Sequence, residues 1–228
     1  MSDWLRISLY VLIALAALAG LFRVAAVPFL CALLWLTVRI FYRVRVVGLE
    51  NVPEKGGALL VSNHQSWADG PIVGARAPRL LRFVMYREHF NHPFFGFFFH
   101  GIRAIPISED DPPHLLRATL EEIAQVLMDG RLVIIFPEGQ CTRDGRIQTF
   151  RRGFELVMRR LPPDAPVPII PIRIDGLWGS IFSYERGKLF WKRPRKFPYP
   201  LTITFGQRMP PRSTAAELQA AVEALKAD

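Results

Sequence analysis

The stretch "GALLVSNHQSWADGP" (residues 57–71) joins an apolar run to a polar turn and then to the expected start of a helix. The apolar run follows glycine and is rich in Leu and Val, which is typical of a buried strand. Pro71 is best tolerated in the first turn of a helix, so residues 63–69 are expected to connect the strand to that helix. His64 and Asp69 would not face each other within one regular helix, but a turn can bring the carboxylate back to the imidazole.

The rest of the chain repeats this alternation of short apolar runs and helical stretches. Segments rich in Val and Ile and bounded by Gly, Pro or Asn predict strands. The expected strands span residues 43–49, 57–63, 81–86, 102–107, 131–136, 167–174 and 201–206. Strands that alternate with helices, with no Ser/Gly-rich linker between them, predict an α/β fold. We therefore expect one domain over residues 43–228, with a mixed, largely buried sheet flanked by helices.

Two of the expected helices have clear boundary signals. Residues 112–128 follow Asp111, which is the expected cap, and begin with Pro112, a residue that suits the first turn of a helix. The last helix begins at Thr214-x-x-Glu217, which is the pattern of a capping box. Both helices are expected to belong to the domain.

The N-terminal segment has a different character, because residues 7–38 are nearly all apolar. Pro28 divides this segment into two halves, each shorter than the roughly 20 apolar residues of a straight membrane span. Residues 1–42 are therefore expected to form a membrane-anchoring helix or a helical hairpin. A cleaved signal peptide, for which "ALAG" (17–20) resembles a cleavage site, and a buried core helix remain alternatives.

The charge balance limits the classes of partner. The chain carries 29 Lys and Arg against 20 Asp and Glu, for a formal net charge of +9. This excess favours a polyanionic partner such as an anionic bilayer, and no nucleic-acid-binding motif accompanies it. The only two cysteines indicate no disulfide framework. The histidines do not form a recognisable ligand pattern, so neither a metal nor another cofactor is expected.

His64 and Asp69 permit two interpretations. In the first, Asp69 accepts a hydrogen bond from one ring nitrogen of His64, and the other nitrogen removes a proton from a hydroxyl. The sequence lacks the G-x-S-x-G pattern of an enzyme serine nucleophile, so this hydroxyl would belong to a substrate. In the second, Ser66 and Asp69 only cap a helix, and His64 is an exposed turn residue.

A second motif lies in "IIFPEGQCTRDGRIQTFRRGFE" (residues 134–155), where an apolar strand leads into a tight turn. The segment that follows is basic and includes Arg143, Arg151 and Arg152. Arginine forks suit phosphate oxygens, so these side chains are candidates for a phosphate-bearing ligand. A solvated basic surface is the alternative.

Taken together, "NHQSWAD" (63–69), "FPEG" (136–139) and "VPIIPI" (167–172) resemble the signatures of the glycerolipid acyltransferases, which include lysophosphatidic acid acyltransferase. The resemblance covers about residues 43–210. The segment 174–206 is similar to the acyltransferase domain of bacterial bifunctional acyl-acyl-carrier-protein phospholipid O-acyltransferases. The resemblance implies that His64 is the general base and Asp69 its orienting carboxylate. A lysophospholipid hydroxyl would then attack the thioester of acyl-CoA or acyl-carrier protein directly, with no acyl-enzyme.

The resemblance also implies which residues shape the substrate site: Asn63, Ser66, Glu138, Gly139, Arg143, Arg151 and Arg152. Glu109 and Cys141 stand where the members that make phosphatidic acid usually carry arginine. This departure favours a lysophospholipid acceptor with a headgroup. The alternatives are a 1-acylglycerol-3-phosphate acyltransferase and a non-catalytic basic membrane-binding protein. The expected location is the inner (cytoplasmic) membrane, with the active site on the cytoplasmic side.

Overall fold

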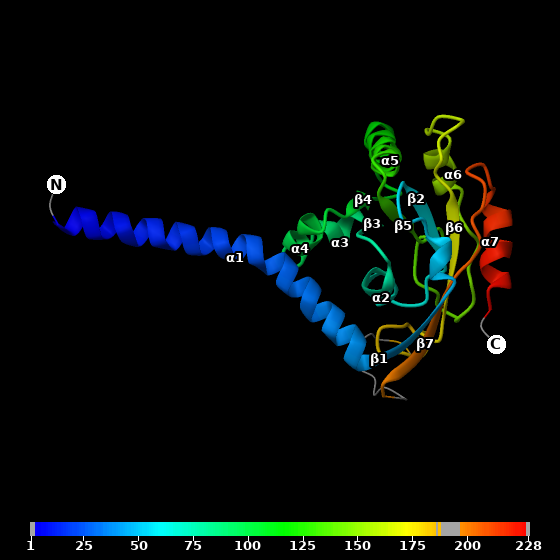
Figure 1. Ribbon diagram of the computed structural model, residues 1–228, viewed down its shortest axis with the longest axis horizontal. Coiled ribbons are helices and arrows are strands. Elements are labelled where there is room, and N and C mark those ends of the chain that lie inside the picture. The colour runs from blue at the N-terminus through cyan, green and yellow to red at the C-terminus, as the bar shows by residue number, and fades with distance from the viewer. Residues whose placement is uncertain (1–2, 186, 188–196, 227–228) are drawn as a thin grey trace.

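The computed structural model describes residues 3–185, 187 and 197–226. Its centre is a seven-stranded sheet in the order β1-β7-β6-β2-β5-β3-β4 (Figure 1). The strands are β1 (Tyr42–Val47), β2 (Ala58–Ser62), β3 (Leu81–Tyr86), β4 (Ile105–Ile107), β5 (Leu132–Ile135), β6 (Ile169–Asp175) and β7 (Tyr199–Phe205). Neighbouring strands are parallel except β6 and β7, which are antiparallel. The predicted mixed sheet and its seven strands are confirmed.

The helices follow the strands in the alternating order that the sequence predicts. They are α2 (Asp69–Arg76), α3 (Arg87–Phe90), α4 (Gly96–Gly101), α5 (Pro113–Met128), α6 (Gly153–Met158) and α7 (Ala215–Ala224), with a short 3₁₀ turn, η1 (Leu49–Asn51). The capping box of Thr214 and Glu217 at the start of α7 is confirmed. The expected cap of α5 is wrong: Pro112 holds the cap position, and the Asp111 carboxylate instead accepts hydrogen bonds from Arg87 at 2.6 and 2.8 Å.

Helices cover both faces of the sheet. On one face, side chains of α5, α6 and α7 pack against Leu59 and Val61 of β2. On the other face, α2 packs against Ala58 and Leu60. All five residues of β2 are buried for this reason, as expected of a strand covered on both sides. Leu60 is paired with Ile134 of β5 and Ile170 of β6. β2 is therefore an interior strand, and the loop after it begins between β5 and β6.

The N-terminal segment is one helix, α1 (Asp3–Phe41), of 39 residues. Figure 1 shows it bent and projecting away from the sheet, with only its carboxyl-terminal part near the domain. Pro28 lies inside this helix and removes one backbone hydrogen bond there, which accounts for a bend. Of the two arrangements expected, a single helix and a helical hairpin, the structure has the single helix. Within the described part of the chain, no helix is both long enough and apolar enough to cross a bilayer.

Two features tie the domain together at its edges. Val38 near the end of α1 is buried against the α2 side of the core, so α1 is continuous with the domain there. Gly101 at the end of α4 lies so close to Val27 of α1 that an added Cβ would meet that side chain at 2.3 Å.

In the segment 174–206, on which the finer resemblance depends, residues 186 and 188–196 lie outside the described residues.

Candidate active site

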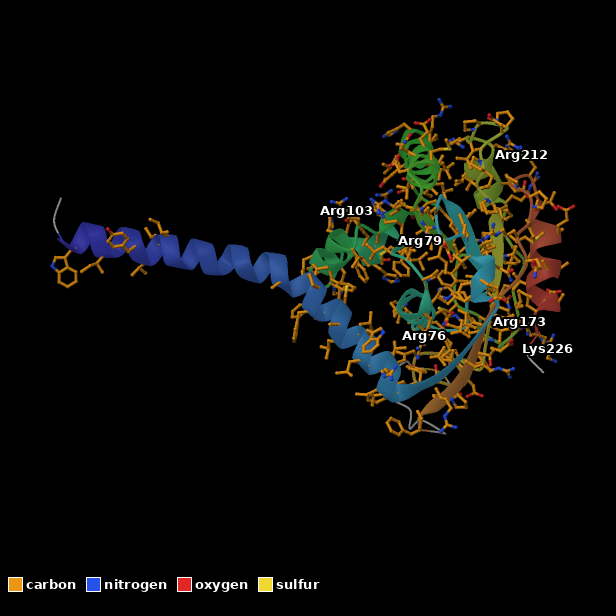
Figure 2. All side chains as sticks on the ribbon, viewed as in Figure 1. Arg76, Arg79, Arg103, Arg173, Arg212 and Lys226 are labelled. Atoms are coloured by element: carbon orange, nitrogen blue, oxygen red, sulfur yellow. The ribbon has the colours of Figure 1, made fainter. Side chains whose placement is uncertain are left out.

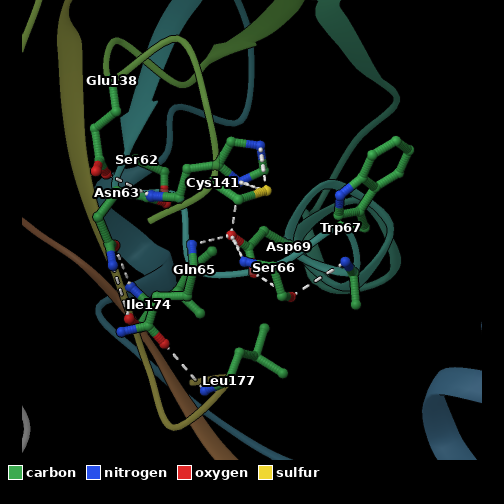
Figure 3. A network of polar contacts seen from close by, with 12 residues as sticks. Ser62, Asn63, Gln65, Ser66, Trp67, Asp69, Glu138, Cys141, Ile174 and Leu177 are labelled. Atoms are coloured by element: carbon green, nitrogen blue, oxygen red, sulfur yellow. Dashed lines mark hydrogen bonds and ion pairs between the residues drawn. The ribbon is translucent and has the colours of Figure 1, made fainter. Parts of the chain in front are cut away.

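The loop between β2 and α2 is organised around the carboxylate of Asp69 (Figure 3). Asp69 is the first residue of α2 and is fully buried. Its Oδ2 accepts the backbone N–H groups of Gln65 at 2.6 Å and Ser66 at 2.9 Å, and its Oδ1 accepts the Ser66 hydroxyl at 2.8 Å. The loop is thereby closed into a turn, as the position of Pro71 predicts.

The same turn brings His64 and Asp69 together. The His64 Nδ1 lies 2.8 Å from Asp69 Oδ2, and the imidazole stacks on the ring of Phe136 with centroids 4.2 Å apart. The His64 side chain is 20% exposed, so it is accessible while its partner is not. A carboxylate on Nδ1 fixes the tautomer and leaves Nε2 to exchange a proton with a ligand. Asp69 therefore both shapes the loop and orients the imidazole, which combines the two interpretations of the sequence.

Cys141 is the other side chain in contact with the imidazole. Its Sγ lies 3.4 Å from Nε2 and 3.8 Å from Nδ1 of His64. The sulfur is thus within hydrogen-bond distance of Nε2, the nitrogen that Asp69 does not contact. Burial by itself lowers the pKa of His64, but the hydrogen bonds that the imidazole makes with Asp69 and Cys141 outweigh it and raise this pKa well above 6.5. The imidazolium is thus stabilised in the free protein.

Glu138 fixes the backbone of the loop that carries His64. It is buried, and its Oε1 accepts the backbone N–H of His64 at 2.6 Å, while Oε2 accepts the backbone N–H of Gln148 at 2.7 Å. Burial raises the pKa of Glu138 to about 7, against the two hydrogen bonds that lower it. Both oxygens face backbone, so Glu138 positions His64 and does not point to a ligand. Next to it, Gly139 has φ +74°, a left-handed turn conformation that favours glycine.

Asn63 and Ser66 are likewise committed to the framework. The Asn63 amide donates to the Ile174 carbonyl at 3.0 Å and accepts its N–H at 2.8 Å, and Ser66 binds Asp69. Gln65, which no motif of the sequence marks, accepts the backbone N–H groups of Leu177 at 3.0 Å and Trp178 at 3.2 Å. These bonds join the catalytic loop to the segment after β6. The sequence signals these bonds only through the presence of amide side chains in this loop.

The three arginines named from the sequence have different surroundings. Arg151 forms an ion pair with Glu109, and Arg152 pairs with Glu155 at 3.1 Å within α6 and its cap. Arg143 follows Thr142, whose backbone N–H donates to the His64 carbonyl at 2.9 Å, so Arg143 starts beside the catalytic loop. Sequence spacing alone could not separate these cases, because each pairing depends on which segment the fold brings nearby.

The arrangement can remove a proton from a bound hydroxyl. Ser62 and Ser66 are buried and already hydrogen-bonded, so neither is presented to His64 as a nucleophile. Among the described residues, no three His, Cys, Asp or Glu side chains are grouped to hold a metal ion. A cavity of about 230 Å³ lies near Arg79 and Arg131 at the amino ends of β3 and β5, away from His64. The candidate site is therefore identified from the contacts of His64 and not from this cavity.

Comparisons with known proteins agree with this geometry. Residues 43–175 match the family model described as Acyltransferase. A chloroplastic 1-acyl-sn-glycerol-3-phosphate acyltransferase of Arabidopsis thaliana is 30% identical over 64% of this chain and 40% of its own length. A 1-acyl-sn-glycerol-3-phosphate acyltransferase of Pseudomonas aeruginosa is 30% identical over 75% of this chain and 60% of its own length. The chain thus spans less than two thirds of the length of both relatives.

A more distant relative and a solved structure complete the comparison. Lysophosphatidylcholine acyltransferase 1 of Rattus norvegicus is 28% identical over 72% of this chain and 30% of its own length. The crystal structure of the 1-acyl-sn-glycerophosphate acyltransferase of Thermotoga maritima superposes with a TM-score of 0.60, covering 89% of this chain and 78% of that one. At 22% sequence identity, this match shows a common fold.

Proposed function

Since this chain belongs to the acyltransferase family, we propose that it transfers a fatty acyl group from acyl-CoA or acyl-carrier protein to the free hydroxyl of 1-acylglycerol 3-phosphate. The observation that carries the proposal is the accessible His64 held by the buried Asp69 at 2.8 Å. Two relatives that are 30% identical carry the name of this activity. No cofactor is required by this chemistry.

The proposed reaction is a direct displacement. His64 in its neutral form accepts the proton of the acceptor hydroxyl at Nε2, and Asp69 stabilises the imidazolium that forms. The hydroxyl oxygen bonds to the thioester carbonyl carbon, the carbon–sulfur bond breaks, and the imidazolium returns its proton to the leaving thiolate. An ester and a free thiol are the products. Glu138 contributes by fixing the backbone of His64.

The identity of the acceptor is where the structure changes the expectation. On sequence alone a headgroup-bearing lysophospholipid is favoured, because Glu109 and Cys141 stand where arginine is usual and a Glu109 that faced the site would repel a phosphomonoester. Glu109 instead forms an ion pair with Arg151, so its charge is already compensated and the repulsion is weakened. Together with the names of the relatives, this supports 1-acylglycerol 3-phosphate as the acceptor.

A headgroup-bearing lysophospholipid is the second candidate acceptor, and one observation favours it. Cys141 packs against His64 and offers no guanidinium fork to a phosphomonoester. The similarity to a rat lysophosphatidylcholine acyltransferase points in the same direction.

We also propose that the protein works at the surface of the inner membrane, with its site on the cytoplasmic side. Large apolar side chains are exposed on α1 and around α4: Trp4, Tyr10, Phe29, Trp35, Phe41, Phe94, Phe95 and Phe97. Exposed apolar groups of this kind suit contact with a lipid interface, and the net charge of +9 suits anionic headgroups.

The test is an acceptor panel with the purified full chain. Lysophosphatidic acid, lysophosphatidylethanolamine and lysophosphatidylcholine are compared by kcat/KM, each with acyl-CoA and with acyl-carrier protein. We expect the highest value with lysophosphatidic acid. A higher value with lysophosphatidylethanolamine would support the second candidate, and no transfer to any lysolipid by the folded protein would refute the function.

A further inference from the structure

The segment after β6 lies against the catalytic loop. The backbone N–H of Trp67 donates to the Phe182 carbonyl at 3.2 Å, and Ser66 forms a β-bridge with Ser183. The contacts from Gln65 to Leu177 and Trp178 hold the beginning of the same segment. The segment is therefore fixed to the loop that carries His64, and its next residue is Tyr184.

Tyr184 connects two residues from other parts of the chain. Its hydroxyl accepts a hydrogen bond from the indole N–H of Trp67 at 3.3 Å, and the guanidinium carbon of Arg143 lies 3.5 Å from the centre of its ring. Trp67 belongs to the loop of His64, and Arg143 belongs to the segment that follows Glu138. The Tyr184 side chain thus contacts both Trp67, from the loop of His64, and Arg143, from the segment after Glu138.

Arg143 differs from the other candidate arginines in its partners. Within the described residues, Arg151 and Arg152 form ion pairs with Glu109 and Glu155, whereas no carboxylate lies within ion-pair distance of Arg143. The neighbouring Asp144 is directed elsewhere, because its Oδ1 accepts from Thr142 Oγ1, the backbone of Arg146 and the amide of Gln148. Arg143 is exposed, so its N–H groups can reach a ligand.

We infer that Arg143 binds a phosphate group of a substrate and that Tyr184, with its hydroxyl held by Trp67, is the residue that positions it. A guanidinium that stacks on an aromatic ring keeps its N–H groups free in its own plane. Such a fork matches phosphate oxygens in a bidentate way, and holding it in place reduces the entropy lost on binding. The inference rests on the proposed function, because it needs a phosphate-bearing substrate beside His64.

Two substrates could supply this phosphate, namely the acyl acceptor and the acyl donor. The experiment separates them with two comparisons in the full chain. Lysophosphatidic acid is compared with monoacylglycerol as acceptor, and acyl-CoA is compared with acyl-pantetheine as donor. Where a phosphate-free substrate is turned over too slowly, inhibition constants of glycerol 3-phosphate against glycerol, and of CoA against pantetheine, give the same comparison.

Arg143→Ala is expected to raise KM for the phosphate-bearing member of one comparison about tenfold to a hundredfold, the usual range for hydrogen bonds to charged groups. KM for the phosphate-free substrates, monoacylglycerol and acyl-pantetheine, should be unchanged. Arg146→Ala is the matched control, because it removes the same charge three residues away, beside Asp144, and should leave both comparisons unchanged. An equal loss with phosphate-free substrates, or no loss with either phosphate, would overturn the inference.

Tyr184 is tested by a pair of substitutions. Tyr184→Leu removes the ring and should raise KM for the same phosphate-bearing substrate about twofold to thirtyfold, the range of a cation–π contact, with kcat retained. Tyr184→Phe keeps the ring and should restore most of the affinity. In the Arg143→Ala background, Tyr184→Leu should add little, because the two residues act together.

A purely structural role of Tyr184 would have another signature. Tyr184→Leu would then lower the melting temperature of the protein, and it would lower kcat with every substrate, including the phosphate-free ones. This result would overturn the positioning role. The failure of the proposed function is recognised separately, because the wild-type protein would then transfer no acyl group to any lysolipid. An active wild-type protein with an indifferent Arg143→Ala variant would leave the function intact and remove only the inference.

Discussion

The loop of residues 63–69 and the segment of residues 139–152 face the same site but differ in how their polar side chains are held. In the loop, Asn63, Ser66 and Asp69 are buried and bonded to backbone or to one another. In the segment, Arg143 and Arg151 are exposed and contact side chains from distant parts of the chain, Tyr184 and Glu109. Figure 2 shows the side chains of the whole domain, with Arg79, Arg103 and Arg212 among those labelled. A preorganised group for proton transfer is thus combined with adjustable groups suited to a charged ligand.

This difference predicts two kinds of mutational effect. Changes in the loop should lower the rate of the chemical step, because they disturb the position or protonation of His64. A change at Arg143 should alter affinity, because its side chain is exposed and its loss should leave the fold intact.

His64→Ala should have the largest effect. Loss of a positioned general base costs about 10²–10⁴-fold in rate, and the carboxylate that orients His64 is itself fully buried. The fold should persist, because the side chain is partly exposed and the loop is closed by Asp69 and Glu138. The rate is measured with saturating substrates, and circular dichroism and the melting temperature check the fold. Near-normal turnover by the folded variant would exclude His64 as the base.

Asp69→Asn should lower kcat next most strongly, by about a hundredfold, and should also shift its pH dependence. Asp69 raises the pKa of His64 above 6.5, so the wild-type rate should increase with pH until the imidazolium loses its proton. Without the carboxylate this increase should occur at lower pH, closer to 6.5. The measurement is kcat/KM against pH for both proteins. If only the melting temperature changes, Asp69 is a loop-closing residue alone.

The predictability of these residues from sequence follows from the range of their contacts. The strands are recognisable because each is a short run of Val, Ile and Leu, and the His64 turn is recognisable because Pro71 fixes where α2 can begin. Both signals are local. The partner of Glu138 could not be predicted, because the backbone of His64 is 74 residues away. Likewise, Tyr184 carries no pattern, and its role depends on a tertiary contact with Arg143.

Two local signals did not decide the structure, for physical reasons. Asp111 has the composition of a helix cap, but a guanidinium offers its carboxylate two charge-assisted hydrogen bonds, so it binds Arg87. Pro28 left both a hairpin and one helix open, and the structure has one helix, because a proline can remain inside a helix that bends around it. In both cases tertiary or geometric alternatives outweighed a local preference.

Glu138→Gln tests the connection between the two halves of the site through stability. Burial raises the pKa of Glu138 from 4.5 to about 7, so the folded protein holds this proton more tightly than the unfolded chain does. The free energy of unfolding should therefore fall as the pH rises between these values, and this fall should be smaller in the variant. Denaturant unfolding at a series of pH values measures it.

The control for Glu138→Gln is Glu54→Gln, which changes an exposed carboxylate and should leave the pH dependence of unfolding as it is in the wild type. If Glu138→Gln unfolds with the wild-type pH dependence, the carboxylate does not titrate in this window, and its bonds to the backbone of His64 and Gln148 outweigh its burial.

Cys141→Ala should have the smallest effect, and it separates the electrostatics of the site from its geometry. The sulfur lies 3.4 Å from Nε2 of His64 and is one of the groups that raise the pKa of this histidine. Its removal leaves the bond to Asp69 and the stacking on Phe136 in place. The pH at which kcat/KM reaches its plateau should therefore move down, while the plateau itself stays nearly constant.

Cys31→Ala is the matched control, because Cys31 is an exposed thiol on α1, and its profile should follow the wild type. A profile of Cys141→Ala that coincides with the wild type would show that the sulfur only fills space beside the ring, whereas a lower plateau at unchanged pH would show that it holds the imidazole in position for Asp69.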